Sequence, residues 1–415
     1  MEIIKKMLRP LVHKYKRIKS RHYLKKKIKK GSQTKILFIC QCQHIWEKQR
    51  CVVEKLSKNS HFNVTLLIVP DNDIADNTVF EKYALDNNIN YIKYYKGILN
   101  YIRPHIVVFP RPYDSYLPKD IRSNKIIKKA KTIYIPYGYS FMELGKTNLS
   151  RAFIPNISLF FADVSYSHNY FITQQQKEII DGLQESVDLG FPYLEDLVVN
   201  KSNYLNGENK FNIKPSSSLK IIWTPRWVTD ETLGGSNFFK YIDCLLEYLL
   251  NNSNYNFVFR PHPYAFANFV KTGLISEERK DYYLKSIENS NNSIYDCDNN
   301  YLNTFFNSDV LITDISSIIA EYMLTKKPII FCHNESNEIL NSFALKCCDE
   351  IFYNAYSFDD IKKYLENIKN GIDPLKEKRN KFIDNFISTQ LGTNDRIEKK
   401  ILEKEGDWFK WAKLK

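Results

Sequence analysis

Short apolar runs alternate with longer amphipathic stretches along the chain from Thr34 onward. Apolar runs bounded by turn residues are typical of buried strands, whereas apolar positions three or four apart indicate helices. The first half predicts a helix over Trp46–Asn59. Its predicted strands are Thr34–Cys40, Phe62–Val69, His105–Phe109, Thr132–Pro136, Leu159–Val164 and Val187–Leu189. Strands separated by helical stretches imply βαβ units and a mainly parallel sheet.

The alternation stops over residues 197–218, which gather Asn, Ser, Gly, Lys and Pro215, and this composition is typical of a linker. It then restarts. Predicted strands follow at Leu219–Trp223, Phe257–Arg260, Ile294–Tyr295, Val310–Thr313 and Pro328–Cys332, and predicted helices at Phe238–Leu250, Glu277–Glu288, Tyr301–Asn307 and Ser316–Leu324.

Two successive doubly wound α/β units fit a chain of 415 residues, which is too long for one ordinary core. We therefore predict two Rossmann-like domains facing a cleft, the arrangement called GT-B in nucleotide-sugar transferases. The predicted segments are a basic segment (1–33), an N-terminal acceptor-side domain (34–196), the linker (197–218), a C-terminal nucleotide-binding domain (219–390) and a C-terminal helix (391–415) that packs back on the first domain.

The net charge of +13 is concentrated at the N-terminus. Residues 1–30 hold thirteen Lys and Arg residues against one acid, Glu2, so they account for +12, and the rest of the chain is close to neutral. Apolar residues spaced three or four apart among these charges predict a basic amphipathic helix. Such helices bind anionic membrane surfaces, where each basic residue adds about 1 kcal/mol. A solvated basic arm and an RNA-binding tail are the alternatives.

Nucleic acid is not an expected partner, because RNA binding needs a basic face on the body as well as a tail. No apolar run approaches the roughly 18 residues that a membrane span needs, and no signal peptide is visible. We therefore expect a cytoplasmic protein, peripheral on the inner face of the membrane. The eight cysteines form no Cys-x-x-Cys pair, so neither a zinc site nor a disulfide framework is predicted, and no metal or cofactor is expected.

Residues directly after each strand are the candidates for chemistry, because ligands of open α/β sheets bind beyond the carboxyl ends of the strands. The most informative junction is Val310-Leu-Ile-Thr-Asp-Ile-Ser-Ser-Ile-Ile-Ala-Glu321. Here Asp314 is expected to cap a helix whose first turn holds Ser316 and Ser317, a suitable place for an anion. Glu321, on the same face as Ser317, is expected to accept hydrogen bonds from a ribose. An ordinary helix cap is the alternative, but it does not explain Glu321 in an apolar turn.

Two other junctions of the second half carry basic residues. In Phe257-Val-Phe-Arg-Pro-His-Pro263, two prolines fix the backbone around His262, whose imidazole can donate to a departing phosphate; Arg260 precedes it. A histidine with a purely structural role is the alternative. In Ile221-Ile-Trp-Thr-Pro-Arg-Trp227, Thr224 and Arg226 follow a strand, and Arg226 is expected either to bridge phosphate oxygens or to pack on tryptophan. We assign Thr224, Arg260 and Asp314 to the same nucleotide and phosphate site.

A further junction, Ile133-Tyr-Ile-Pro-Tyr-Gly-Tyr-Ser-Phe141, lies in the first half. Gly138 permits a close approach of the backbone to a ligand, and Tyr137 and Tyr139 are expected either to bind an acceptor hydroxyl or to pack in the core.

The order of Thr-Pro-Arg-Trp, Arg-Pro-His-Pro and Ile-Thr-Asp-Ile-Ser-Ser, followed by Pro328-Ile-Ile-Phe331, resembles the CDP-glycerol glycerophosphotransferase family of teichoic-acid and capsule polymerases. The resemblance covers roughly residues 130–335 and implies that His262, Ser316 and Ser317 hold the phosphates of a cytidine-nucleotide donor. Glu321 takes the place of an aspartate of the family. The implied reaction is transfer of an alditol phosphate or a sugar to a surface polysaccharide or a lipid-linked acceptor.

One difference concerns the base that deprotonates the acceptor. The family usually has Trp-His-Gly in the first domain, whereas this chain has Pro136-Tyr137-Gly138. Neutral tyrosine, with a pKa of about 10, is a poor base. His44, after the first strand, is a substitute by position, and Asp114 and Glu143 are others.

Two other functions remain open. One is a glycosyltransferase that uses CMP-sugars, since bacterial sialyltransferases also carry His-Pro and Ser-Ser elements, although their usual Asp/Glu-Asp-Gly base motif is not found here. The other is a non-catalytic protein that binds membrane or RNA through the basic segment.

Overall fold

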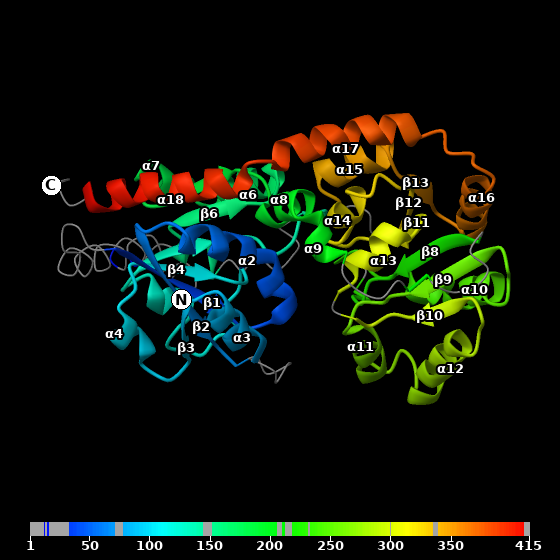
Figure 1. The fold of residues 1–415 in the computed structure, drawn as a ribbon, viewed down its shortest axis with the longest axis horizontal. Helices are drawn as coiled ribbons and strands as arrows, with labels where there is room; N and C mark the ends of the chain where they lie inside the picture. The colour runs from blue at the N-terminus through cyan, green and yellow to red at the C-terminus, as the bar shows by residue number, and fades with distance from the viewer. Residues whose placement is uncertain are drawn as a thin grey trace, which may run out of the picture. The chain divides into compact units, whose positions relative to one another are not determined.

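The computed structural model describes the chain as two compact units. The described residues are 12, 15, 33–70, 78–143, 152–205, 210–211, 218–230, 233–298, 300–334 and 339–410. Unit 1 comprises residues 1–139, 148–195 and 390–415, and unit 2 comprises 140–147 and 196–389. Each unit has its own sheet, as Figure 1 shows, and its own hydrophobic core.

Unit 1 is built on a sheet in the order β3-β2-β1-β4-β5-β6-β7 within the described residues. All neighbouring strands are parallel. The strands are β1 (Thr34–Cys40), β2 (Phe62–Ile68), β3 (Asn90–Lys93), β4 (Ile106–Phe109), β5 (Lys131–Tyr134), β6 (Leu159–Ala162) and β7 (Glu185–Asp188). The apolar residues of the strands between the two edges are buried, so the sheet forms the centre of the unit.

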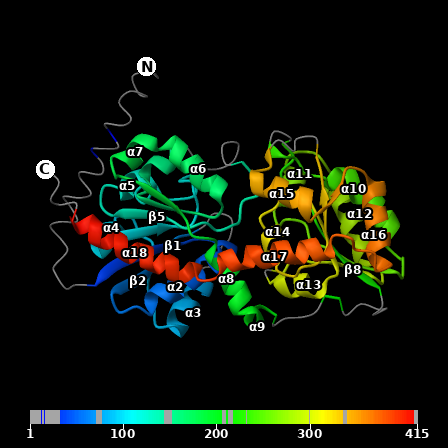
Figure 2. The same cartoon turned by 90° about the horizontal axis from the view of Figure 1, so that it is seen from above.

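The core on one face of this sheet is closed by helices from both ends of the chain. The helix α2 (Gln43–Ser57) contacts α18 (Thr393–Lys410), and Ile397 and Ile401 of α18 are fully buried in that core. Figure 2 shows α18 running beside α2. The other helices of the unit within the described residues are α3 (Thr78–Asp86), α4 (Ile98–Ile102), α5 (Ser123–Ile126), the 3-10 turn η2 (Ile154–Asn156), α6 (Ser165–Gln174), α7 (Gln176–Ile180) and the first half of α8 (Pro192–Val199).

Unit 2 repeats the doubly wound arrangement in the order β10-β9-β8-β11-β12-β13, again with parallel neighbours. Its strands are β8 (Leu219–Thr224), β9 (Tyr255–Phe259), β10 (Ser293–Tyr295), β11 (Val310–Thr313), β12 (Ile329–Cys332) and β13 (Tyr353–Ala355). The order reverses between β8 and β11, which creates a topological switch point.

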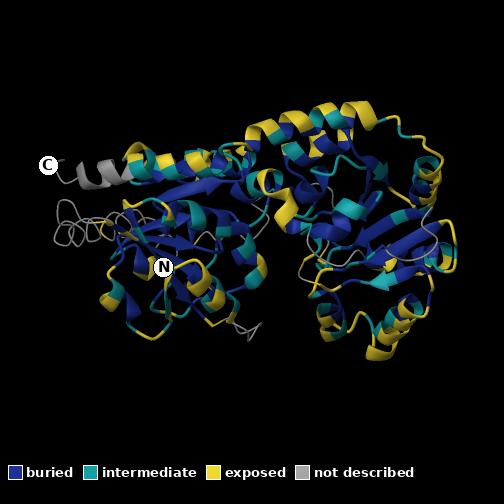
Figure 3. Ribbon diagram, viewed as in Figure 1, coloured by how far each residue is buried: buried dark blue, intermediate teal, exposed yellow. Residues whose placement is uncertain are grey.

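Helices pack on both faces of the second sheet, and their outward sides are exposed (Figure 3). Aromatic residues fill the core around Trp223 and Phe238, whose rings stack 5.9 Å apart. The helices are α9 (Lys201–Tyr204), α10 (Phe238–Leu249), α11 (Ala265–Lys271), α12 (Glu277–Glu288), α13 (Leu302–Asn307), α14 (Ile319–Met323), α15 (Ser342–Glu350), α16 (Phe358–Lys369) and α17 (Lys376–Gln390).

The parallel α/β architecture predicted from the apolar runs is confirmed, but two edge strands were missed. Strands β3 and β13 are short and lie at the edges of their sheets, and the sequence Asn90–Lys93 lacks an apolar run. An edge strand is covered on fewer sides than a central strand, so its sequence needs fewer apolar residues. Part of the segment predicted as an irregular linker is helical, because α8 ends at Val199 and α9 follows.

Residues 140–147 belong to unit 2, although the strand pattern places them in the N-terminal domain. Met142 forms a β-bridge with Leu340, the backbone N–H of Glu143 donates to the carbonyl of Ile339 at 2.7 Å, and Asn341 Nδ2 donates to the Ser140 carbonyl at 2.8 Å. These bonds join segments about 200 residues apart, so no local pattern predicts them.

The basic amphipathic helix predicted for residues 1–30 lies outside the described residues, apart from Val12 and Tyr15. Among the residues that are described, no helix combines the length and the apolar character that a membrane crossing requires.

Candidate functional site

The predicted chemistry of unit 2 gathers at the carboxyl edge of its sheet. Thr224 ends β8, Arg260 and His262 follow β9, and Asp314 follows β11. Because β9, β8 and β11 are consecutive in the sheet, the loops after them are neighbours. This edge includes the switch point between β8 and β11, where open α/β sheets bind their ligands.

His262 is held by an aromatic neighbour and by its own loop. Its ring stacks on Trp227 with 5.5 Å between centroids, and its Nδ1 accepts the backbone N–H of Tyr264 at 3.2 Å. Since Nδ1 acts as an acceptor in this bond, the proton of a neutral ring is assigned to Nε2. The side chain is exposed to solvent. The geometry therefore orients Nε2 as a hydrogen-bond donor at the strand end.

Ser316 and Ser317 lie in the turn between β11 and α14, whereas the sequence placed them in the first turn of the helix. Helix α14 begins only at Ile319 and is five residues long. Ser316 is half-buried and its Oγ accepts the backbone N–H of Ile318 at 3.5 Å, whereas Ser317 is exposed. The helix expected at Ser316–Leu324 was too long, because the turn of residues 316–318 takes the place of its first turn.

Asp314 supports the loop after β8 instead of capping α14. Its Oδ1 accepts the backbone N–H of Arg226 at 2.8 Å, and its Oδ2 accepts that of Asn237 at 2.9 Å. Burial raises the pKa of this carboxyl to about 6, against the lowering effect of those two N–H groups and of the charge on Arg226. The expected helix cap was wrong, because the tertiary fold brings other backbone donors to this carboxylate.

Arg226 is packed inside unit 2, so the expected bidentate contact with phosphate is not preformed. Its Nη1 donates to the Leu233 carbonyl and its Nη2 contacts Met142 Sδ at 3.5 Å. Burial lowers the pKa of the guanidinium, although Asp314 opposes this change. Gly234 has a φ of +91° and lies so close that an added Cβ would sit 2.8 Å from Nη1, which explains the need for glycine.

Thr224, also predicted to bind the nucleotide, is buried and links two strands. Its Oγ1 donates to Thr313 Oγ1 at 2.9 Å, and the Thr313 hydroxyl is also within 3.1 Å of the Thr224 carbonyl. Its side chain therefore joins β8 to β11 at the switch point.

Arg260 and Glu321 belong to one partly buried network. Arg260 Nη1 pairs with Asp296 at 2.9 Å, and its guanidinium lies over the ring of Tyr301 at 4.7 Å. The Tyr301 hydroxyl donates to the Glu321 carboxylate, which is only 2% exposed. The Glu321 carboxylate therefore already accepts a hydrogen bond from Tyr301, whereas the sequence predicted that it would accept hydrogen bonds from a ribose. The network connects the loop before α13 to α14.

In unit 1 the predicted groups lie after β1 and β5. His44 is exposed near the start of α2, with Nδ1 3.1 Å from Cys42 Sγ. The Tyr137 hydroxyl lies 3.4 Å from that of Tyr113, and burial raises the pKa of Tyr137, so its phenol stays neutral and is no base.

Gly138 is half-buried beside Tyr139. Tyr139 is only 5% exposed and packs on Phe191, so the structure favours the core packing that the sequence left open beside a contact with the acceptor.

The two acidic alternatives for the base differ in their surroundings. The Asp114 carboxylate accepts two hydrogen bonds from Ser123, one from the backbone N–H at 2.8 Å and one from the hydroxyl at 2.7 Å. Asp114 therefore stabilises the start of α5. Glu143 lies in the segment that belongs to unit 2. Neither arrangement points to proton abstraction from an acceptor bound on unit 1.

Sequence reasoning missed Arg111. It follows β4 in Phe109-Pro-Arg-Pro-Tyr113, which repeats the signal used for His262: a buried strand, then a polar side chain between two prolines. Arg111 is only 7% exposed, and its guanidinium lies 4.5 Å from the centre of the Tyr116 ring.

Comparison with known protein families gives a match that includes the candidate site. Residues 145–403 match the family described as CDP-Glycerol:Poly(glycerophosphate) glycerophosphotransferase, and this range includes His262, Ser316 and Ser317. The chain belongs to the CDP-glycerol glycerophosphotransferase family. The family resemblance drawn from the motifs is thereby confirmed. Tyr137, where the family pattern predicts histidine, precedes the matched range.

Two relatives are named for the synthesis of teichoic acid. The chain is 25% identical over 384 residues to the minor teichoic acid biosynthesis protein GgaB of Bacillus subtilis, covering 81% of this chain and 39% of that protein. It is also 25% identical over 231 residues to the teichoic acid poly(glycerol phosphate) polymerase of Staphylococcus epidermidis, covering 52% of this chain and 30% of the polymerase. The chain thus corresponds to well under half of either relative.

Solved structures support the GT-B-like fold. The wall teichoic acid polymerase TagF, in a variant soaked with CDPG, aligns over 99% of this chain and 97% of its own with a TM-score of 0.57 and 16% identity. UDP-GlcNAc 2-epimerase from Neisseria meningitidis, bound to UDP-GlcNAc, aligns over 89% of this chain and 100% of its own with a TM-score of 0.60 and 12% identity. At these identities the likeness concerns the fold alone.

Proposed function

We propose that this protein transfers an alditol phosphate, such as glycerol phosphate, from a CDP-linked donor to a cell-surface polymer or its lipid-linked precursor. The observation that carries the proposal is the family match over residues 145–403, within which His262 and the Ser316–Ser317 turn follow strands of the same sheet edge. Both relatives are named for teichoic acid synthesis, a process that builds such polymers.

In the proposed reaction a hydroxyl of the acceptor attacks the donor phosphorus that carries the alditol. A new P–O bond forms, the P–O bond to CMP breaks, and the acceptor's proton passes to a base. The Nε2–H of His262 donates to the departing CMP phosphate, and the hydroxyls of Ser316 and Ser317 hold the phosphate oxygens. Donors positioned in advance lower the barrier because they stabilise charge that develops in the transition state.

For the base we propose His44. Tyr137 has a raised pKa, and Asp114 is engaged by Ser123. Histidine is the side chain whose ordinary pKa lies closest to neutrality, which suits a general base at physiological pH. In this proposal His262, Ser316 and Ser317 hold the donor's phosphates without a metal ion. We therefore propose that the reaction needs no metal ion or cofactor, and activity should persist in EDTA.

The donor class is tested by thermal-shift measurements with CDP, CMP, UDP and GDP compounds, followed by transfer assays with CDP-glycerol. Selective stabilisation by CDP compounds supports the proposal. Stabilisation by CMP-sugars, with transfer from them and none from CDP-alditols, would identify a glycosyltransferase instead.

The role of His262 is tested by His262→Ala. We expect turnover to fall by roughly two orders of magnitude or more, because a donor to the leaving group is lost, with the fold retained. His61→Ala is the matched control, since His61 is an exposed histidine before β2. The double variant Ser316→Ala/Ser317→Ala should bind CDP more weakly. Unchanged turnover, or unchanged CDP affinity, removes the respective residues from the mechanism.

We also propose that the basic segment of residues 1–30 holds the enzyme at the cytoplasmic membrane face, beside a lipid-linked acceptor. Its charge of +12 supports binding to anionic lipids. Removing these residues should release the protein from phosphatidylglycerol liposomes while activity on water-soluble acceptors is preserved. Sedimentation with liposomes measures this, and continued binding of the truncated chain contradicts the anchor.

A further inference from the structure

A cluster of hydrogen-bond donors lies at the carboxyl edge of the sheet in unit 1, outside the residues assigned so far to the nucleotide. It combines the guanidinium of Arg111 with the hydroxyls of Tyr113 and Tyr137, from the loops after β4 and β5. The Tyr113 and Tyr137 hydroxyls lie 3.4 Å apart. The Tyr116 ring joins them to Arg111, because it lies 4.5 Å from the guanidinium and 5.6 Å from the Tyr113 ring.

The position of Arg111 is set by its surroundings. Pro110 and Pro112 restrict the backbone on either side, and the guanidinium lies over the Tyr116 ring. The Tyr116 carbonyl in turn accepts Gln41 Nε2 at 2.9 Å, which ties this loop to the loop after β1. A cation that is only 7% exposed and held in this way is prepared for a specific contact.

The chemistry of the cluster favours an anion. Guanidinium is a donor at every physiological pH. Burial raises the pKa of both Tyr113 and Tyr137, so both phenols keep their protons and can donate. The nearest carboxylate in sequence, Asp114, is turned to the backbone N–H and hydroxyl of Ser123.

We propose that Arg111, Tyr113 and Tyr137 form a subsite for a phosphate monoester or diester of the acceptor. The inference rests on the proposed function, in which the acceptor is a phosphate-containing polymer. Arginine binds phosphate oxygens through two parallel N–H groups, and a tyrosine hydroxyl adds a further donor. This subsite gives Tyr137 a role in recognition where the family pattern predicts a basic histidine.

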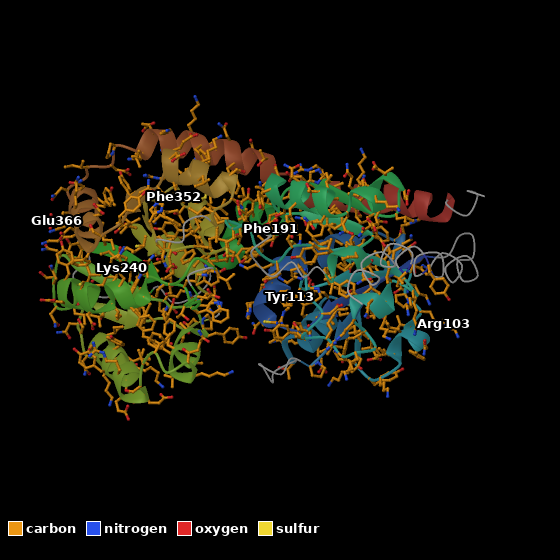
Figure 4. The ribbon with its side chains drawn as sticks, turned by 180° about the vertical axis from the view of Figure 1, so that it is seen from behind. Arg103, Tyr113, Phe191, Lys240, Phe352 and Glu366 are labelled. Carbon is orange, nitrogen blue, oxygen red and sulfur yellow. The ribbon has the colours of Figure 1, made fainter. Side chains whose placement is uncertain are left out.

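The phosphate can come from the acceptor or from the unit that the donor transfers, and kinetics with two acceptors separates these sources. Both acceptors end in the same glycerol hydroxyl, but one carries a neighbouring glycerol phosphodiester and the other a neutral glycoside. Transfer from CDP-glycerol is measured for the wild-type chain, Arg111→Gln and Arg111→Lys. Arg103→Gln is the matched control, because Arg103 is an exposed arginine near the opposite end of β4 (Figure 4).

Arg111→Gln should raise the KM for the phosphodiester acceptor about tenfold or more, since a charged hydrogen bond is lost. The KM for the neutral acceptor, the KM for CDP-glycerol and the CDP affinity should stay unchanged. Arg111→Lys should recover part of the preference, and Arg103→Gln should behave as wild type. Equal changes for both acceptors, no change, or a raised KM for the donor alone each overturn the assignment to the acceptor.

Direct binding separates this inference from the proposed function. Glycerol 3-phosphate and a glycerol phosphate dimer are titrated into the full chain without donor, with ³¹P line broadening as the readout. Weaker binding by Arg111→Gln, with thermal stability retained, supports the subsite even if no CDP-alditol is turned over. Efficient transfer from CDP-glycerol combined with wild-type binding by Arg111→Gln rejects the subsite alone.

Discussion

Single residues at strand ends determine what this fold can bind. His262 and Arg111 are in similar positions, each after a buried strand and between two prolines, one in each unit. Proline fixes φ, so these loops lose little conformational freedom on binding a ligand. Arg226 also follows a strand, and its Nη nitrogens contact Leu233 and Met142.

At the residue scale, Asp314 should give unit 2 a characteristic pH dependence. Burial raises its pKa to about 6 in the folded chain, whereas an unfolded aspartate titrates at about 3.9. Because the folded state holds this proton more tightly, the contribution of Asp314 to stability decreases as pH rises from about 4 to about 6, by up to about 1.4 kcal/mol per pH unit.

Asp314→Asn should remove this slope. It should also lower stability at every pH, because one of the two backbone N–H groups loses its acceptor. Urea unfolding at pH 4, 5, 6 and 7, followed by a probe in unit 2, compares the two proteins. Identical slopes for the variant and the wild type would show that Asp314 does not titrate in this range.

At the scale of elements, the residues of the candidate site lie in turns and beside short helices, whereas the longer helices pack on the sheet. Helix α17 is anchored by Arg379, whose side chain is 1% exposed. Its guanidinium pairs with Asp373 and donates to the Lys326 carbonyl at 2.9 Å, and the Tyr353 hydroxyl donates to the same carboxylate at 2.7 Å. One buried arginine therefore joins α17, the turn after α14 and the edge strand β13.

Arg379→Met should lower the free energy of unfolding of unit 2 by about 3–5 kcal/mol, because Asp373 is left with its charge uncompensated. Lys326→Met is the control. It removes the exposed pair with Asp384, and such pairs contribute about 0–1 kcal/mol. Denaturant unfolding measures both variants, and equal losses would contradict a special role for the buried pair.

At the scale of the whole molecule, the end of the chain stabilises its beginning. Helix α18 belongs to unit 1, where Ile397 and Ile401 are buried against α2 and the first sheet. Polar contacts add to this packing: Asn59 donates to Glu398 at 2.9 Å, and Lys400 pairs with Glu185 at 2.5 Å. The core of unit 1 is therefore complete only when α18 is packed against it.

Ile401→Ala should destabilise unit 1 by about 2–5 kcal/mol through lost burial and a cavity. Hydrogen exchange read by mass spectrometry should show faster exchange in β1 and α2, with unit 2 protected as in the wild type. Substitution of exposed Leu391 by alanine is the control. Equal loss of protection in both units would contradict the assignment of α18 to unit 1.

The sequence by itself determined the parallel α/β fold, the central strands and the position of the candidate site at strand ends. Apolar runs such as Val310–Thr313 are local, and their burial depends little on which strand lies beside them. The motifs around His262 and Ser316 likewise keep their order along the chain, so the family resemblance was visible before the structure.

Only the tertiary structure decided which polar groups are available. The hydrogen-bond partners of Asp314 and Glu321 lie 20 to 88 positions away along the chain, Arg226 contacts Met142 84 positions away, and Tyr139 packs on Phe191. A hydrogen bond or a ring contact requires groups within a few ångströms, and sequence spacing does not fix such distances between separate loops. The physical reason is that the pattern of apolar residues determines which segments are buried, whereas the pairing of the strands determines which polar side chains come into contact.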